Sequence, residues 1–173
     1  MARLDRDAVI VAALELADER GLEAFSLRRV AERLGVTPMA LYRHVEGKDD
    51  LLDAMADVLY GELALPDPDR DWWEGLAGLA RSTRALLRAR PWAVPLLARP
   101  LRGPHQHALD QALFEALRRA GFSAAEAREL HDQLSNMVFA LVVPELAGRP
   151  NRAAFERGLD LLHAGLDARL KGG

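Results

Sequence analysis

Four side chains near residue 40 have the chemistry needed to contact a nucleic acid. Tyr42, Arg43 and His44 can donate hydrogen bonds to phosphates or to base edges, and Met39 offers an apolar contact. Residues 26–48 carry five Lys or Arg against two Glu, a local charge of about +3 in a chain whose net charge is −3. A basic segment on an acidic chain is sufficient for phosphate contact and limits non-specific binding.

Two short helices, one on either side of Gly35, would position these side chains. Thr37 can cap the second helix with its hydroxyl, and Pro38 falls at the first helical position, where a missing N–H costs nothing. The apolar residues that would pack the two helices inward are Val30, Ala31, Leu34, Leu41 and Val45. The pattern predicts a helix-turn-helix, whose second helix is presented to the major groove of DNA.

Composition narrows the class of protein. With 173 residues and no cysteine, the chain can bury a core without disulfides, and zinc–cysteine sites and thiol catalysis are excluded. No apolar run approaches the ~20 residues that cross a bilayer, and the first five residues do not form a signal peptide. We therefore expect a cytoplasmic protein with no membrane partner.

Helix signals run along the whole chain, and we expect an all-α fold of about nine helices. Gly21 would end the first helix, Ser123 and Glu126 form a capping box, and Asn151 would cap the last helix. The predicted helices are at residues 5–20, on both sides of Gly35, and at 48–63, 72–89, 104–120, 123–143 and 151–170, with a short helix and turns between Pro91 and Pro104.

The proline-rich stretch at residues 65–69 suggests a domain boundary. We expect a three-helix DNA-binding domain at residues 1–47 and a connecting helix at 48–65. Residues 66–173 would form a helical domain for effector binding and dimerisation.

Over about residues 5–60 the chain resembles the TetR family of repressors. The resemblance rests on Gly35-Val36, on the run Leu41-Tyr42-Arg43-His44-Val45, and on Lys48 with Leu51-Leu52. Beyond residue 60 it lies in helix order and length, and residues 72–143 look most like the tetracycline-repressor branch. The resemblance implies a homodimer that binds a palindromic double-stranded DNA operator, with a pocket whose small-molecule effector releases the DNA.

The resemblance also implies which residues contact DNA. The family's contacting positions fall on Arg28, Thr37, Pro38, Met39, Ala40, Tyr42, Arg43, His44 and Lys48. The two arginines can read guanine edges, while the tyrosine, histidine and lysine can hold phosphates. Met39 and Ala40 can meet only a thymine methyl group or fill space. A solvated helix face is the alternative reading of these positions.

One departure from the tetracycline repressors concerns metal. The positions of the histidines that hold their magnesium–drug chelate are occupied here by Ala64 and Pro95, according to our alignment. His105 and His107 stand two apart on a predicted helix and point away from one another, so they do not suggest a metal site. We therefore expect no metal and no cofactor, and an effector that is a small molecule of unknown identity.

The candidate residues for an effector pocket are polar or bulky side chains in the second half of the chain. A buried polar side chain needs a partner, and a ligand can be that partner. The candidates are Trp92, His105, Phe114, His131, Asn136 and Met137. For each of them, a place in an ordinary core is the alternative.

The two last long helices carry more apolar surface than one face of a monomer can hide. Two such helices from each chain would form a four-helix dimer interface. The interface candidates are Leu130, Leu134, Leu141, Leu159, Leu162 and Leu166. A larger monomeric core is the alternative.

These observations predict a ligand-responsive transcriptional repressor rather than an enzyme. We find no nucleophile–base pair, no glycine-rich phosphate loop and no metal constellation. The alternative from another class is a DNA-independent small-molecule-binding protein, or an enzyme, that kept a decayed motif. A third reading is an activator or an architectural DNA binder without an effector.

Overall fold

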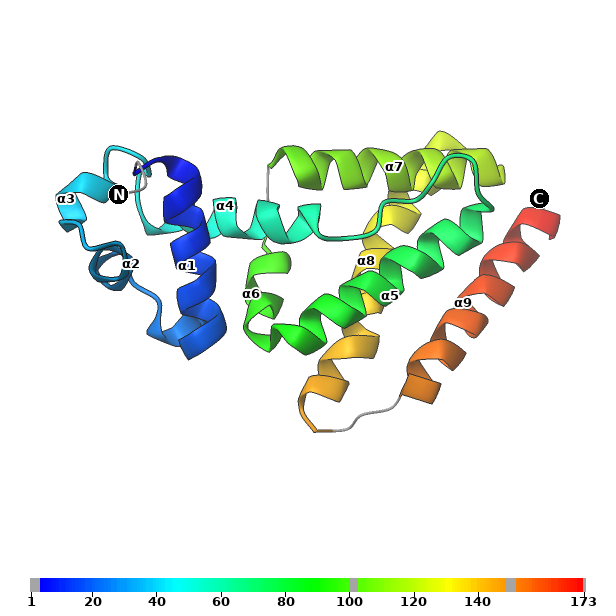
Figure 1. The fold of residues 1–173 in the computed structure, drawn as a ribbon. Helices are drawn as coiled ribbons and strands as arrows, with labels where there is room; N and C mark the ends of the chain where they lie inside the picture. Colours follow the sequence, from blue (N-terminus) through cyan, green and yellow to red (C-terminus); the bar gives the residue numbers. More distant parts are fainter. Residues whose placement is uncertain (1–3, 100–102, 149–151, 173) are drawn as a thin grey trace. The chain divides into compact units, whose positions relative to one another are not determined.

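The computed structural model describes residues 4–99, 103–148 and 152–172, and within these it contains nine α-helices, two 3₁₀ helices and no strand (Figure 1). The expected all-α fold is confirmed, whereas the predicted cap Asn151 lies outside the described residues. The elements are α1 (Arg6–Arg20), η1 (Leu22–Ala24), α2 (Leu27–Leu34), α3 (Pro38–Leu41), α4 (Lys48–Gly61), α5 (Trp72–Ala89), η2 (Pro91–Ala93), α6 (Val94–Leu97), α7 (Pro104–Ala120), α8 (Ala124–Leu146) and α9 (Arg152–Gly172).

Two helices differ in length from the expectation. Helix α3 has only four residues, because the following amides bond three residues back: the Arg43 N–H donates to Ala40 O and the His44 N–H to Leu41 O. Helix α8 passes through Pro144 and continues to Leu146, so this proline does not end the helix.

The chain forms two compact units, each described here by itself. The first unit consists of residues 1–61 and 90–106, and the second of residues 62–89 and 107–173. The sequence-based division placed everything after residue 65 in one domain. In the structure, residues 90–106 pack instead with the N-terminal helices.

Contacts from distant parts of the chain explain why residues 90–106 join the first unit. Helix α6 packs on α4, and the Tyr60 hydroxyl donates to the Leu97 carbonyl over 2.9 Å. Arg90 and Trp92 both reach the Asp18 carboxylate on α1, with the indole N–H 2.9 Å away. These partners stand more than 70 residues from Asp18 in sequence, which is why local patterns did not reveal them.

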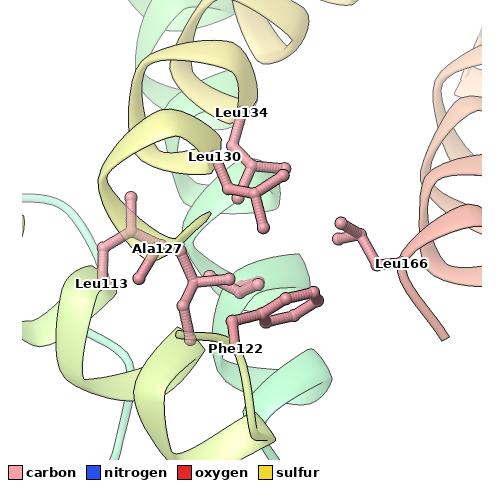
Figure 2. Close-up of a cluster of buried hydrophobic side chains, with 8 residues drawn as sticks. Leu113, Phe122, Ala127, Leu130, Leu134 and Leu166 are labelled. Atoms are coloured by element: carbon pink, nitrogen blue, oxygen red, sulfur yellow. The ribbon is translucent and has the colours of Figure 1, made fainter. Parts of the chain in front are cut away.

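The core of the second unit gathers apolar side chains from four helices. Figure 2 shows Leu113 of α7 with Ala127, Leu130 and Leu134 of α8 close to Phe122, while Leu166 of α9 points toward them. The buried members of this core cluster are Leu76, Leu113, Leu117, Phe122, Ala127, Leu130, Leu134 and Leu166.

This core corrects the expected dimer surface. Leu130, Leu134, Leu159 and Leu166 are buried inside the single chain, so they are core residues and present no free surface to a second copy. The other two interface candidates, Leu141 and Leu162, are half-buried. The reason is that α8 packs on both α5 and α9 within one chain.

Candidate nucleic-acid interface

The segment that carries the candidate DNA contacts is built by local signals. Ser26 caps α2 by accepting the Arg29 N–H, and Gly35 ends α2 in a left-handed conformation with φ of 66°. Thr37 caps α3 by accepting the Ala40 N–H over 3.3 Å, and Pro38 takes the first turn. The two short helices on either side of Gly35 are therefore confirmed.

Helix α3 and the turn after it divide into an apolar inner side and a polar outer side. Leu41 and Val45 are buried, whereas Met39 is 73% exposed and Tyr42 is 53% exposed. Arg43 is also exposed. The side chains able to touch bases therefore face solvent, as the pattern predicted.

The structure places all nine candidate DNA-contacting residues in the first unit, and none is buried. The exposed ones are Arg28, Thr37, Pro38, Met39, Tyr42, Arg43 and Lys48, and the half-buried ones are Ala40 and His44. Their role in DNA contact remains a prediction, but their accessibility satisfies its first requirement.

The arginines of α2 differ in how firmly protein partners hold them. Arg28 pairs with Glu32, and both side chains are more than half exposed, so this pair is worth little and leaves the guanidinium available. Arg33 bonds both Glu19 and Glu15, which raise its pKa and keep it charged. Arg29 donates to the Ala24 carbonyl. Arg29 and Arg33 therefore have structural partners, in line with their omission from the candidate contacts.

Lys48 and Arg43 present the more accessible cations. Lys48 is the first residue of α4, and its ammonium lies 5.8 Å from the centre of the Phe25 ring. Within the part of the chain that the structure describes, neither cation forms an ion pair with a carboxylate. Both are exposed, and both can neutralise a phosphate without first breaking an ion pair.

The structure does not bring the six effector-pocket candidates together in one unit. Trp92 and His105 lie in the first unit, where they bond Asp18 and Asp57 respectively. The other four lie in the second unit: Phe114, His131, Asn136 and Met137.

Within the second unit, two of the candidates contact other side chains and two are exposed. The His131 ring lies between the carboxylates of Asp110 and Asp132, 3.0 and 3.1 Å away. Asn136 and Met137 are exposed on α8, so the single chain gives neither of them buried surroundings. The Phe114 ring is covered by the Arg128 guanidinium at 5.6 Å. The pocket assignment therefore remains a prediction without geometric support from these four.

Among the described residues, no three or more His, Asp or Glu side chains gather closely enough to hold a metal ion. Ala64 lies beyond the end of α4, and Pro95 lies in α6. No helix within the described ranges combines the length and apolarity that crossing a membrane requires.

Among the ion pairs that sequence reasoning missed, two hold distant helices together. Arg6 bonds Asp50, 44 residues away, and no local pattern announces this contact. Arg84 bonds Glu145, which lies buried in α8. A single carboxylate in the apolar run from Val142 to Leu146 was the available signal for the second pair.

Comparison with known proteins supports the assignment of a helix-turn-helix to the N-terminal part of the chain. Residues 9–55 match the family described as bacterial regulatory proteins of the tetR family, and residues 65–157 match the tetracyclin repressor-like C-terminal domain. The chain belongs to the TetR family. The predicted resemblance is therefore confirmed along most of the chain.

Two relatives show the extent of the similarity. The chain is 36% identical to the tetracycline repressor protein class A from transposon 1721 of Escherichia coli, over 99% of this chain and 80% of that protein. It is 35% identical to an HTH-type transcriptional regulator of Saccharopolyspora erythraea, over 84% of this chain. That second match spans 63% of the relative, which is less than two thirds of its length.

Two solved structures match nearly the full length of the chain. The TetR family protein ActR of Streptomyces coelicolor, in complex with actinorhodin, has a TM-score of 0.86 and 28% identity, covering 98% of this chain and 99% of that one. BioQ with its double-stranded DNA operator has a TM-score of 0.80 and 30% identity, covering 96% and 99%.

Proposed function

We propose that this chain is a transcriptional repressor that binds a palindromic operator as a homodimer and releases it when a small-molecule effector binds. The observation that carries the proposal is the division of α3 and its following turn, with Leu41 and Val45 buried while Met39 and Tyr42 face solvent beside Arg43. A buried inner side holds the segment in place, and an exposed outer side can enter a major groove. The structure of BioQ with its double-stranded DNA operator supports this use of the helix-turn-helix.

The roles of the exposed side chains follow from their chemistry. Arg43 and Arg28 would read guanine edges through two parallel hydrogen bonds. Tyr42, His44 and Lys48 would hold phosphates, which fixes position without specifying sequence. In a dimer with a two-fold axis, the two copies of α3 would have to lie about 34–36 Å apart to reach successive major grooves.

A homodimer would cover apolar surface that the single chain leaves open. On α8 and α9, Leu161 is 76% exposed, Val143 is 42% exposed and Met137 is 39% exposed. Large apolar side chains that a single chain leaves exposed are candidates for an interaction surface. The half-buried Leu141 and Leu162, already candidates from the sequence, would complete it.

Effector control requires only that the effector binds one conformation of the dimer better than another. Suppose the ligand prefers a dimer in which the two helix-turn-helix segments are not spaced to fit DNA. Its differential affinity would then shift the protein toward that conformation and away from the DNA-bound one. The ActR complex with actinorhodin supports a small-molecule effector for this chain.

Selection of bound duplexes from a random library tests the proposal. The full-length chain should retain duplexes that share a two-fold symmetric sequence, and Arg43→Ala should lose preference at one position of each half-site. Actinorhodin and tetracycline serve as the first effector probes, because ActR was solved in complex with actinorhodin and another relative is named a tetracycline repressor. Retained duplexes without shared symmetry, or no retained duplex at all, would overturn the proposal.

A further inference from the structure

The turn that follows α3 is fastened by two charged residues from other helices of the first unit. Arg6, at the start of α1, donates one N–H to the His44 carbonyl over 2.8 Å. Asp50, in the first turn of α4, accepts the Glu46 backbone N–H over 2.8 Å. The two residues therefore hold opposite ends of the segment 44–46.

Arg6 and Asp50 also bond each other through two parallel contacts. The Arg6 Nη2 and Nη1 atoms lie 2.6 and 2.9 Å from the two Asp50 carboxylate oxygens. Such a fork fixes direction as well as distance. The hydrogen bond from Arg6 lowers the pKa of the Asp50 carboxyl, and the same bond to Asp50 raises the pKa of Arg6, so both groups stay charged. Side-chain exposures of 45% and 25% leave the pair only partly solvated.

A fastened exit matters because α3 is so short. Four residues contain too few backbone hydrogen bonds to hold a helix by themselves, and isolated helices of this length are unstable. Thr37 fixes the first end of α3 through its cap. The other end continues into the turn that Arg6 and Asp50 hold, where Val45 is buried and its N–H donates to the Leu41 carbonyl.

We propose that Arg6 and Asp50 are positioning residues that set the orientation of α3 and of Tyr42 and Arg43 for operator contact. This inference rests on the DNA-binding function proposed above and adds two residues to it. Neither residue needs to touch DNA: the pair acts through the backbone of residues 44–46.

The rival explanation is that Arg6 is an ordinary phosphate contact and Asp50 an ordinary surface acid. The two explanations predict opposite signs for Asp50→Asn. Removing a negative charge near bound DNA should strengthen binding if only long-range attraction matters. Loss of a positioning residue should weaken it instead, because asparagine has one acceptor oxygen in place of two and cannot keep both the fork to Arg6 and the bond from the Glu46 N–H.

The experiment measures operator affinity for Arg6→Ala, Asp50→Asn and the double variant, using a duplex selected by the wild type. Glu19→Gln is the matched control, since Glu19 is also an acid paired with an arginine in the first unit but bonds nothing in residues 44–46. We expect Arg6→Ala and Asp50→Asn each to bind about tenfold to a hundredfold more weakly. The double variant should bind no more weakly than the worse single variant, and Glu19→Gln should not weaken binding.

A second measurement needs no DNA and separates positioning from loss of folding. Amide hydrogen exchange of Glu46 should quicken about tenfold or more in Asp50→Ala, which removes both acceptor oxygens, while core amides of α4 keep their protection. Stronger operator binding by Asp50→Asn, additive losses in the double variant, or unchanged exchange of Glu46 would each overturn the proposal. If the wild type binds no duplex, the proposed repressor function is overturned instead. The exchange rate of the Glu46 amide then decides whether Arg6 and Asp50 hold the turn at residues 44–46.

Discussion

Arg84 and Glu145 form the least exposed ion pair among the described residues, with Nη2 and Oε2 2.7 Å apart and side-chain exposures of 16% and 3%. The pair joins α5 to α8, and Arg88 adds a second contact to the same carboxylate at 3.1 Å. The Arg84 guanidinium also lies 5.2 Å from the centre of the Phe155 ring on α9. The Arg84–Glu145 pair thus links three helices of the second unit.

Glu145→Gln should destabilise the chain by about 2–3 kcal/mol, because it leaves the Arg84 charge without a buried partner. Glu156→Gln is the matched control: its partner Arg81 is 54% exposed, so that substitution should cost at most about 1 kcal/mol. Urea unfolding of the two variants gives the comparison. Equal costs would show that burial of the Glu145 pair contributes nothing extra.

The same carboxylate should make stability depend on pH. Hydrogen bonds from Arg84, opposed by burial, lower the pKa of Glu145 below its ordinary value of 4.5. The unfolded chain therefore takes up a proton first as the pH falls, so the contribution is complete above about pH 5.5 and decreases below it. Urea midpoints of the wild type and Glu145→Gln should converge as the pH is lowered. A constant gap down to acidic pH would contradict this.

Lys48→Ala should weaken operator binding for all sequences alike, because a phosphate contact carries no base information. The slope of log affinity against log salt should fall by about 1. Arg119→Ala is the control: it removes one exposed cation in the second unit, far along the chain from the candidate interface. Fluorescence anisotropy at several salt concentrations measures both. A sequence-dependent loss for Lys48→Ala would mean that the lysine reads bases.

Leu161→Glu should dissociate the proposed homodimer, since it places a charge where the second copy would bury an apolar side chain. Leu65→Glu is the control, because Leu65 is also an exposed leucine but lies outside α8 and α9. Light scattering after size-exclusion chromatography gives the mass of each variant. A dimer that survives Leu161→Glu would place the interface elsewhere.

Gly103→Ala should destabilise the start of α7 by about 1–2 kcal/mol. Its new Cβ would collide with the Asp57 carboxylate, which accepts the backbone N–H groups of His105 and Gln106. Gly78→Ala is the opposite case: its Cβ meets open space within α5, so it should stabilise by about 0.5–1 kcal/mol. Thermal unfolding that shows the same sign for both would refute this reading of Gly103.

Local chemistry determined the helix-turn-helix and most helix ends from the sequence. The caps at Thr37 and Ser123 and the glycine stop at Gly35 were all read correctly, because each depends on neighbours within about four residues. The inward side of α3 followed from the spacing of Leu41 and Val45. Tight turning after Leu41 was not foreseen, since the sequence alone does not tell a continuing helix from a 3₁₀ turn.

Tertiary structure alone decided how distant segments pair. Residues 90–106 belong with the N-terminal helices because Asp18 and α4 hold them, and Leu130 and Leu134 entered the chain's own core rather than a dimer surface. The Arg6–Asp50 bond is of the same kind. An apolar stripe or a charge in the sequence states what a side chain needs, but many partners satisfy that need equally. Which partner it receives depends on the packing of the whole chain, where long-range contacts compete for the same buried volume.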